Sequence, residues 1–226
     1  MKNLLEIACF NTASCLIAQR AGADRIEFCK SYESGGISPD KTEILSIKKQ
    51  LSIPLHIIIR PREGNFIYSS LELKEMLDTI CFCRENKVDG IVFGILNRRN
   101  EIDEKAISEI KNSAGEMKCT FHRAIDECRD LNASIEMLIH LGIHSVLSSG
   151  GNRSALEGKR KLAELAASYS DKIEIIAGGN VRSTQFPELF ETKCSSFHSS
   201  AILDDRGICN ENEIVQLKKI LQSNPI

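Results

Sequence analysis

Short apolar runs alternate along the chain with longer segments in which apolar residues recur every three to four positions. The short runs are rich in β-branched residues and are typical of buried strands, whereas the longer spacing predicts amphipathic helices. The predicted strands cover residues 4–9, 24–29, 54–60, 90–96, 118–122, 145–149, 173–177 and 195–200. The predicted helices cover residues 12–21, 39–50, 70–86, 103–113, 132–141, 155–168, 184–190 and 212–222.

Eight strands therefore alternate with eight helices within 226 residues. This repeat is typical of a (β/α)8 TIM barrel in the α/β class. An open doubly wound sheet is the alternative. We favour the barrel because the count is eight and no stretch has the composition of a second domain, a linker or a low-complexity tract. The prediction is a single TIM-barrel domain over residues 1–226.

Alternate strand residues of a barrel face its interior, and the others face the helices. With the apolar positions facing the helices, the ionisable side chains that face inward include Glu6, Glu27, Arg60, His122 and His198. Buried charges must be paired or lie near solvent, so these residues form either a packing layer of ion pairs or an active site. Active sites of this fold lie at the carboxyl ends of the strands, where we expect Arg60, His122 and His198. The catalytic candidates are Glu27, His122 and His198.

The loops after the strands carry groups that suit an anion. Arginines hold planar carboxylate or phosphate groups through paired hydrogen bonds. Glycine backbone after the seventh strand and small hydroxyls after the eighth are where such barrels often hold phosphate, although paired glycines also occur simply in tight turns. The anion-binding candidates are Arg60, Arg62, Arg123, Ser149, Gly178, Gly179, Ser199 and Ser200.

Composition narrows the class of protein. The net charge of −2 gives no indication of nucleic-acid binding, and no apolar run approaches the ~20 residues of a membrane span. The first residues contain Glu6 and lack the apolar core of a signal peptide, so we expect a cytoplasmic protein. The nine cysteines are odd in number and include no Cys-x-x-Cys, so we expect mostly reduced, buried thiols rather than a disulfide framework.

Ten short motifs carry a family resemblance. In chain order they are Glu6-Ile-Ala-Cys9, Gly22-Ala-Asp-Arg-Ile-Glu-Phe-Cys29, Gly35-Gly-Ile-Ser-Pro39, Ile59-Arg-Pro-Arg62, Phe66-Ile-Tyr-Ser69, Val92-Phe-Gly94, Thr120-Phe-His-Arg-Ala124, Ser149-Gly150, Ala155-Leu-Glu-Gly158 and Phe197-His-Ser-Ser-Ala201. The sequence closely resembles the CutC family, named as copper homeostasis proteins. The resemblance implies a cytoplasmic TIM barrel, often a homodimer or higher homo-oligomer, and a Cu(I) site at two strand-end cysteines that match Cys9 and Cys29.

The chain departs from the family pattern in two loops. Glu63 and Asn65 stand where the family usually has a glycine and an aspartate, and Asn180 stands where it usually has a third glycine. A metal or acid role for the missing aspartate is therefore not expected here.

Two functions compete, and the first is Cu(I) binding by Cys9 and Cys29, because thiolates are soft ligands. Cys9 is one step out of phase with Glu6, so it faces inward only if the phase changes at the strand end; otherwise the two thiols are buried and unliganded. The second is an enzyme acting on a small anionic metabolite by isomerisation, aldol-type or hydrolytic chemistry. A barrel that only binds a ligand or partner is a third, weaker option.

Overall fold

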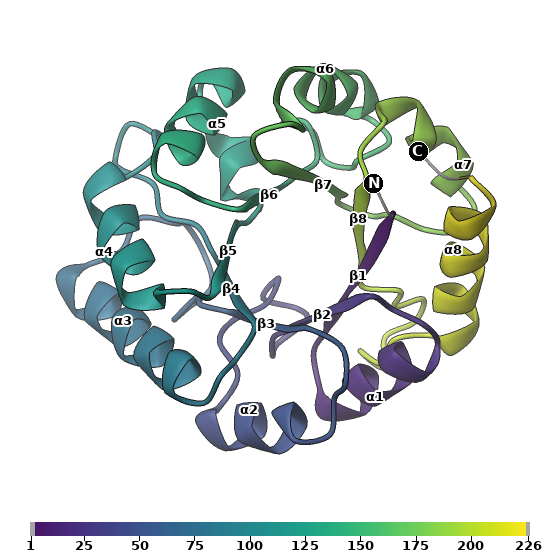
Figure 1. Cartoon of the computed structure of the whole chain (residues 1–226), viewed down its shortest axis with the longest axis horizontal. Helices are drawn as coiled ribbons and strands as arrows, with labels where there is room; N and C mark the ends of the chain where they lie inside the picture. The colour runs from purple at the N-terminus through teal and green to yellow at the C-terminus, as the bar shows by residue number, and fades with distance from the viewer. Residues whose placement is uncertain (1–2, 225–226) are drawn as a thin grey trace.

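The eight apolar runs form parallel strands that pair in chain order and close into a barrel, which confirms the predicted (β/α)8 fold (Figure 1). The structure, a computed structural model, describes residues 3–224. The strands are β1 (Leu4–Cys9), β2 (Arg25–Phe28), β3 (Leu55–Ile58), β4 (Gly90–Phe93), β5 (Lys118–Phe121), β6 (Ser145–Ser148), β7 (Glu174–Gly178) and β8 (Ser196–Ser199). The helices are α1 (Thr12–Arg20), α2 (Lys41–Lys48), α3 (Ser70–Glu85), α4 (Glu104–Ala114), α5 (Leu131–His140), α6 (Lys159–Tyr169), α7 (Phe186–Leu189) and α8 (Glu211–Ser223).

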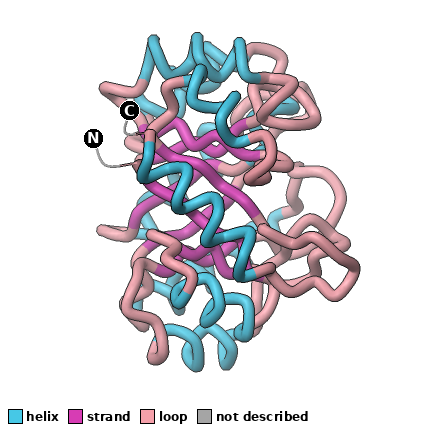
Figure 2. Tube along the Cα trace, turned by 90° about the vertical axis from the view of Figure 1, so that its right-hand side faces the viewer, coloured by secondary structure: helices cyan, strands magenta, loops and turns pink. Residues whose placement is uncertain are grey.

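The helices form an outer ring around the strands (Figure 1), and the side view shows helices above, below and in front of the strands (Figure 2). Strand residues that face the helices are apolar, and the side chains of Ile7, Phe28, Phe93, Phe121 and Phe197 are almost completely buried. Burying one such side chain stabilises the fold by about 1.5–3 kcal/mol, so the wall between strands and helices supplies the main hydrophobic core. None of the helices in the described part of the chain is long and apolar enough to span a membrane.

The predicted start of the sixth helix is wrong. The structure begins α6 at Lys159 instead of residue 155, because the preceding residues form turns beneath the loop after β6. A Cβ atom at Gly158 would lie 1.8 Å from the carbonyl oxygen of Ser149, so this glycine allows the two segments to touch. Two short 3-10 turns, η1 (Arg123–Glu127) and η2 (Phe190–Thr192), add to the predicted elements.

Candidate active site at the mouth of the barrel

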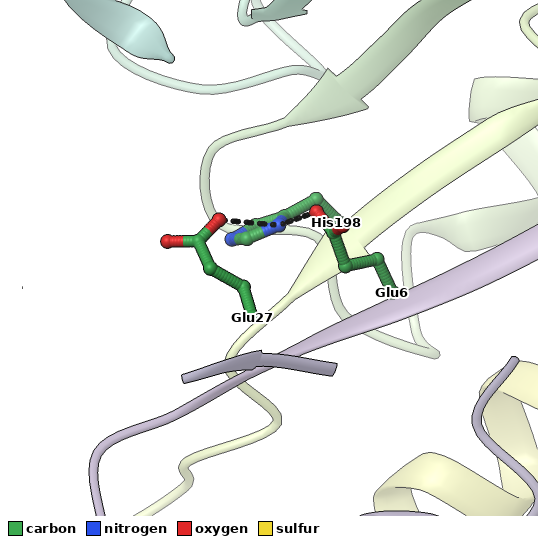
Figure 3. Close-up of side chains that lie close together, drawn as sticks. All are labelled: Glu6, Glu27 and His198. Carbon is green, nitrogen blue, oxygen red and sulfur yellow. Dashed lines mark hydrogen bonds and ion pairs between the residues drawn. The ribbon is translucent and has the colours of Figure 1, made fainter. Parts of the chain in front are cut away.

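An ionisable cluster occupies the barrel interior at β1 and its two neighbours, β8 and β2. The strand register places Glu6 beside both Arg25 and His198, and places Glu27 beside Ala8. Arg25 Nε donates a hydrogen bond to one oxygen of Glu6, and His198 Nδ1 donates to the other at 2.7 Å (Figure 3). Glu27 Oε2 lies 3.7 Å from the same His198 nitrogen. The inward positions expected for Glu6, Glu27 and His198 are therefore observed.

The environment gives the two glutamates different protonation behaviour. Burial would raise the pKa of Glu6, but Arg25 and the hydrogen bond from His198 hold that pKa well below its ordinary value. Burial raises the pKa of Glu27 to about 7, and the nearby negative charge of Glu6 adds to this rise. Burial opposes the charged form of His198, yet the Glu27 and Glu6 carboxylates raise its pKa overall. Glu6 is thus a fixed carboxylate and Glu27 exchanges protons near neutral pH, whereas the raised pKa of His198 favours its protonated form.

Arg60 follows β3 and is buried at the same end of the barrel. Its guanidinium donates hydrogen bonds of 2.9 Å to the carbonyl oxygens of Ser34, Gly36 and Gly64, and it lies 5.1 Å from the ring centre of Phe66. Among residues 3–224, no carboxylate forms an ion pair with Arg60. Because a buried charge without a counter-ion is unfavourable, this position favours an anionic ligand.

A cavity of about 140 Å³ brings these groups together at the mouth. Its lining includes Glu27, Cys29, Arg60, His122, Arg123 and His198. This volume is smaller than the ~300–1,000 Å³ of a typical ligand pocket, so it suits a small molecule or the reacting end of a larger one. The predicted meeting of Arg60, His122 and His198 at one rim is therefore observed.

His122 is fixed in position and uncharged. The backbone N–H of Ala124 donates to His122 Nδ1 at 3.1 Å, and the ring centre lies 4.8 Å from that of Phe66. Burial and the positive charge of Arg60 lower the pKa of His122 to about 3. At neutral pH this imidazole therefore does not exchange protons as the sequence suggested, and it acts as a hydrogen-bonding group.

Arg123 is less free than predicted because Asp126 neutralises it. Arg123 Nε lies 3.0 Å from Asp126 Oδ2, and the Asp126 carboxylate also accepts hydrogen bonds from Ser148 Oγ at 2.6 Å and Ser149 Oγ at 2.8 Å. The sequence predicts that His122, Arg123 and Asp126 lie together after the fifth strand, and the structure pairs Arg123 with Asp126. The half-exposed Arg123 side chain lines both the small cavity and an adjoining open cleft of about 720 Å³. The cleft leaves room for a substrate that extends beyond the cavity.

Arg62, predicted to bind an anion, is used within its own loop. Its Nε bonds Glu72 at 2.5 Å, its Nη2 donates to the Ile67 carbonyl at 2.8 Å, and its guanidinium lies over the ring of Tyr68. This arginine therefore folds the loop after β3 and is not among the residues lining the small cavity.

The predicted phosphate-binding segment after β7 and β8 is also internally bonded. Ser199 Oγ donates to the Val181 carbonyl at 2.7 Å, and Ser200 Oγ accepts from Arg182 Nη2 at 3.2 Å. Two glycines complete the segment: a Cβ atom at Gly178 would lie 2.4 Å from Leu147, and the φ angle of Gly179 is +103°. Sequence reasoning did not select Arg182, and anion binding by the hydroxyls and glycines stays a prediction.

The structure does not bring the Cys9 and Cys29 side chains together. Cys9 packs in the main core between strands and helices, with Cys15, whereas Cys29 packs on the inner side with Ala8 and Ile58. Burial raises the pKa of both thiols well above the ordinary value for cysteine. Two thiols packed in separate clusters do not fit a shared Cu(I) site, which needs converging thiolates.

A model of the CutC family matches residues 3–203 of this chain. The chain belongs to the CutC family. It is 37% identical over 198 residues to a family protein CutC of Klebsiella pneumoniae, covering 88% of this chain and 80% of the relative. It is 38% identical over 202 residues to the protein of the same name from Mesorhizobium japonicum, covering 89% of this chain and 78% of the relative.

A solved CutC structure has the same barrel. The protein of Streptococcus agalactiae superposes with a TM-score of 0.84 at 29% identity, covering 88% of this chain and 98% of that one. The resemblance that the ten motifs indicate is therefore confirmed at the level of family and fold.

Proposed function

We propose that this CutC-family protein is an enzyme that binds a small anionic metabolite at the barrel mouth and transfers a proton with Glu27 and His198. One observation carries the proposal: Arg60, a buried arginine with no counter-ion within residues 3–224, lines the same cavity of about 140 Å³ as Glu27 and His198. The cation favours a carboxylate or phosphate on the ligand. The pair supports general acid–base catalysis near neutral pH.

Each group of the cluster has a distinct task in the proposed reaction. Arg60 binds the negative charge of the substrate. Glu27 accepts or returns a proton at the reacting atom, and His198, 3.7 Å from Glu27, favours the ionised form of this base. Glu6 is a positioning residue, because its hydrogen bond of 2.7 Å fixes the ring and the protonated Nδ1 of His198.

Anion binding is tested by thermal unfolding with phosphate, sulfate, pyruvate and glycerol 3-phosphate. An anion present at ten times its Kd stabilises the folded state by about 1.4 kcal/mol, which raises the melting temperature of a chain of this length by roughly 3–6 °C. We expect the rise to be lost in Arg60→Gln and largely kept in Arg60→Lys. The control is Arg160→Gln, an exposed arginine on α6 whose removal should leave the rise unchanged. A full rise in Arg60→Gln would contradict the proposal.

Copper handling is the other function that the family name suggests, and the Streptococcus agalactiae relative is named a copper homeostasis protein. The separate packing of Cys9 and Cys29 does not favour it. Titration with Cu(I) against a chromogenic chelator decides the matter, with Cys29→Ser as the variant. We expect no stoichiometric Cu(I) uptake; uptake that is lost in Cys29→Ser would instead support copper binding.

Two predictions from the resemblance accompany this proposal. We propose that the protein is cytoplasmic and forms a homodimer or a higher homo-oligomer. Light scattering on the purified chain tests the oligomer, and cell fractionation tests the location.

A further inference from the structure

Three buried polar atoms of the residues that line the cavity have no hydrogen-bond partner among residues 3–224. They are Glu27 Oε2, Arg60 Nε and His122 Nε2. Leaving such an atom unsatisfied costs about 1–3 kcal/mol, so native structures seldom keep one without a reason. All three residues line the same small cavity, where a bound ligand would supply partners for these atoms.

The hydrogen bond from Ala124 determines what His122 can offer a ligand. Because Nδ1 accepts the Ala124 N–H at 3.1 Å, the proton of the neutral ring is on Nε2, which is therefore a donor. The ring is held in place by Phe66 on one side and by Gly94, where a Cβ atom would lie 2.4 Å from the ring. A ligand must therefore present an acceptor oxygen to His122.

Glu27 sets the complementary requirement. Its Oε2 has no hydrogen-bond partner, and in the ionised carboxylate this oxygen accepts a hydrogen. Arg60 adds a fixed positive charge to the same cavity, which stabilises negative charge as it develops on an oxygen. A donor for one oxygen, a base for a neighbouring hydrogen and a cation together suit a carbonyl compound with an adjacent C–H bond. An alcohol offers a hydrogen and an oxygen too, but it has no oxygen on which the charge could be delocalised.

We propose that the cavity binds a small anionic ketone or aldehyde and that Glu27 and His122 interconvert it with its enol form. This inference rests on the proposed function and narrows it to one substrate class. The Glu27 carboxylate takes the proton from the carbon next to the carbonyl. The C–H electron pair forms a carbon–carbon double bond, and the carbonyl electron pair moves to the oxygen, which accepts the hydrogen bond from His122 Nε2. Return of a solvent-derived proton to the same carbon gives exchange. In a 2-hydroxy carbonyl compound, transfer of the hydroxyl proton to the former carbonyl oxygen and addition of a proton at the former carbonyl carbon give an isomer, with the new carbonyl on the carbon that carried the hydroxyl.

The test is the rate at which C–H is exchanged for C–D in D2O, measured by proton NMR as the loss of the C–H signal. Simple members of the substrate class serve as probes. The probes are pyruvate, hydroxypyruvate, dihydroxyacetone phosphate and glyceraldehyde 3-phosphate, with lactate and glycerol 3-phosphate as matched alcohols. We expect the wild-type protein to accelerate exchange of at least one carbonyl compound and of neither alcohol. The rate should rise with pH around a midpoint near 7, because the base is the ionised form of Glu27.

Three variants assign the roles. Glu27→Gln should slow exchange by about 100-fold or more, because the base is lost. His122→Phe keeps a ring without the donor and should slow exchange by about 100-fold, whereas His122→Gln restores a donor and should recover part of the loss. Recovery by glutamine separates a donor role from a purely structural one, and Glu27→Gln tests the base should the phenylalanine variant fail to fold.

The outcomes separate this inference from the proposed function. Wild-type exchange rates in His122→Phe, or exchange of the alcohols, would overturn the carbonyl assignment. Melting shifts with the anions but no exchange of any of the four carbonyl probes would also overturn it and leave the anion-binding enzyme in place. If neither melting shifts nor exchange is observed, both the carbonyl assignment and the proposed anion-binding function are wrong.

Discussion

Replacing Glu6 by glutamine should destabilise the barrel more than any exposed charge removal. The Glu6 side chain is completely buried and accepts hydrogen bonds from Arg25 and His198. Glutamine keeps the shape of the side chain but loses its charge. Its NH2 group takes the place of one carboxylate oxygen and faces either the Arg25 or the His198 donor. Removing one partner of a buried ion pair costs about 3–5 kcal/mol. Arg25 keeps a second carboxylate, Glu174, at 3.3 Å, so we expect the lower limit of about 3 kcal/mol.

Equilibrium unfolding in urea at pH 7 measures this loss, and the melting temperature should fall by roughly 6–12 °C. Glu211→Gln is the control, because its ion pair with Arg20 is exposed and is worth about 0–1 kcal/mol. A double variant, Glu6→Met with Arg25→Met, removes both charges and should recover part of the stability. A loss in Glu6→Gln no larger than in the control would refute the idea that a buried charge network holds the barrel interior.

The same carboxylate predicts a pH dependence. Because the folded pKa of Glu6 lies below that of the unfolded chain, its contribution is complete above the ordinary pKa of a glutamate. It is lost as the pH falls towards the folded pKa. Wild-type stability should therefore fall more steeply below about pH 5 than that of Glu6→Gln.

Two further predictions follow from the interior. Burial and Arg25 lower the pKa of His56 to about 4, so between about pH 6.5 and 4 the unfolded chain binds a proton at this residue that the folded chain does not. The free energy of unfolding, measured in urea, should therefore fall less steeply with pH over this range in His56→Gln than in the wild type. An equal pH dependence in the two proteins would contradict this prediction. In Gly94→Ala the new methyl group would meet the His122 ring. The free energy of unfolding should therefore fall by about 1–3 kcal/mol, and the rise in melting temperature caused by the anions should be smaller. Wild-type stability and a wild-type rise with anions would show that Gly94 does not confine the ring.

The architecture could be read from the sequence because periodicity is a local property. The two-residue alternation of β1 and β2 identified Glu6 and Glu27 as inward and Ile7 and Phe28 as outward, and both assignments hold in the barrel. The start of α6 could not be read in this way, because residues 155–158 have helical composition. Their turns depend on the contact between Gly158 and Ser149, which belongs to a different segment.

The chain alone thus determined the eightfold repeat, favoured a closed barrel over an open sheet, and identified polar residues that face the interior. Only the tertiary structure decided which of these are free to meet a ligand. Arg60 has no counter-ion among the described residues, whereas Arg62 is paired with Glu72 and Arg123 with Asp126. The physical reason is that pairing depends on register and closure: Glu6 and His198, 192 positions apart, touch only because the last strand returns to the first. Side-chain alternation specifies a face of a strand, but hydrogen bonds across the closed barrel specify the partner.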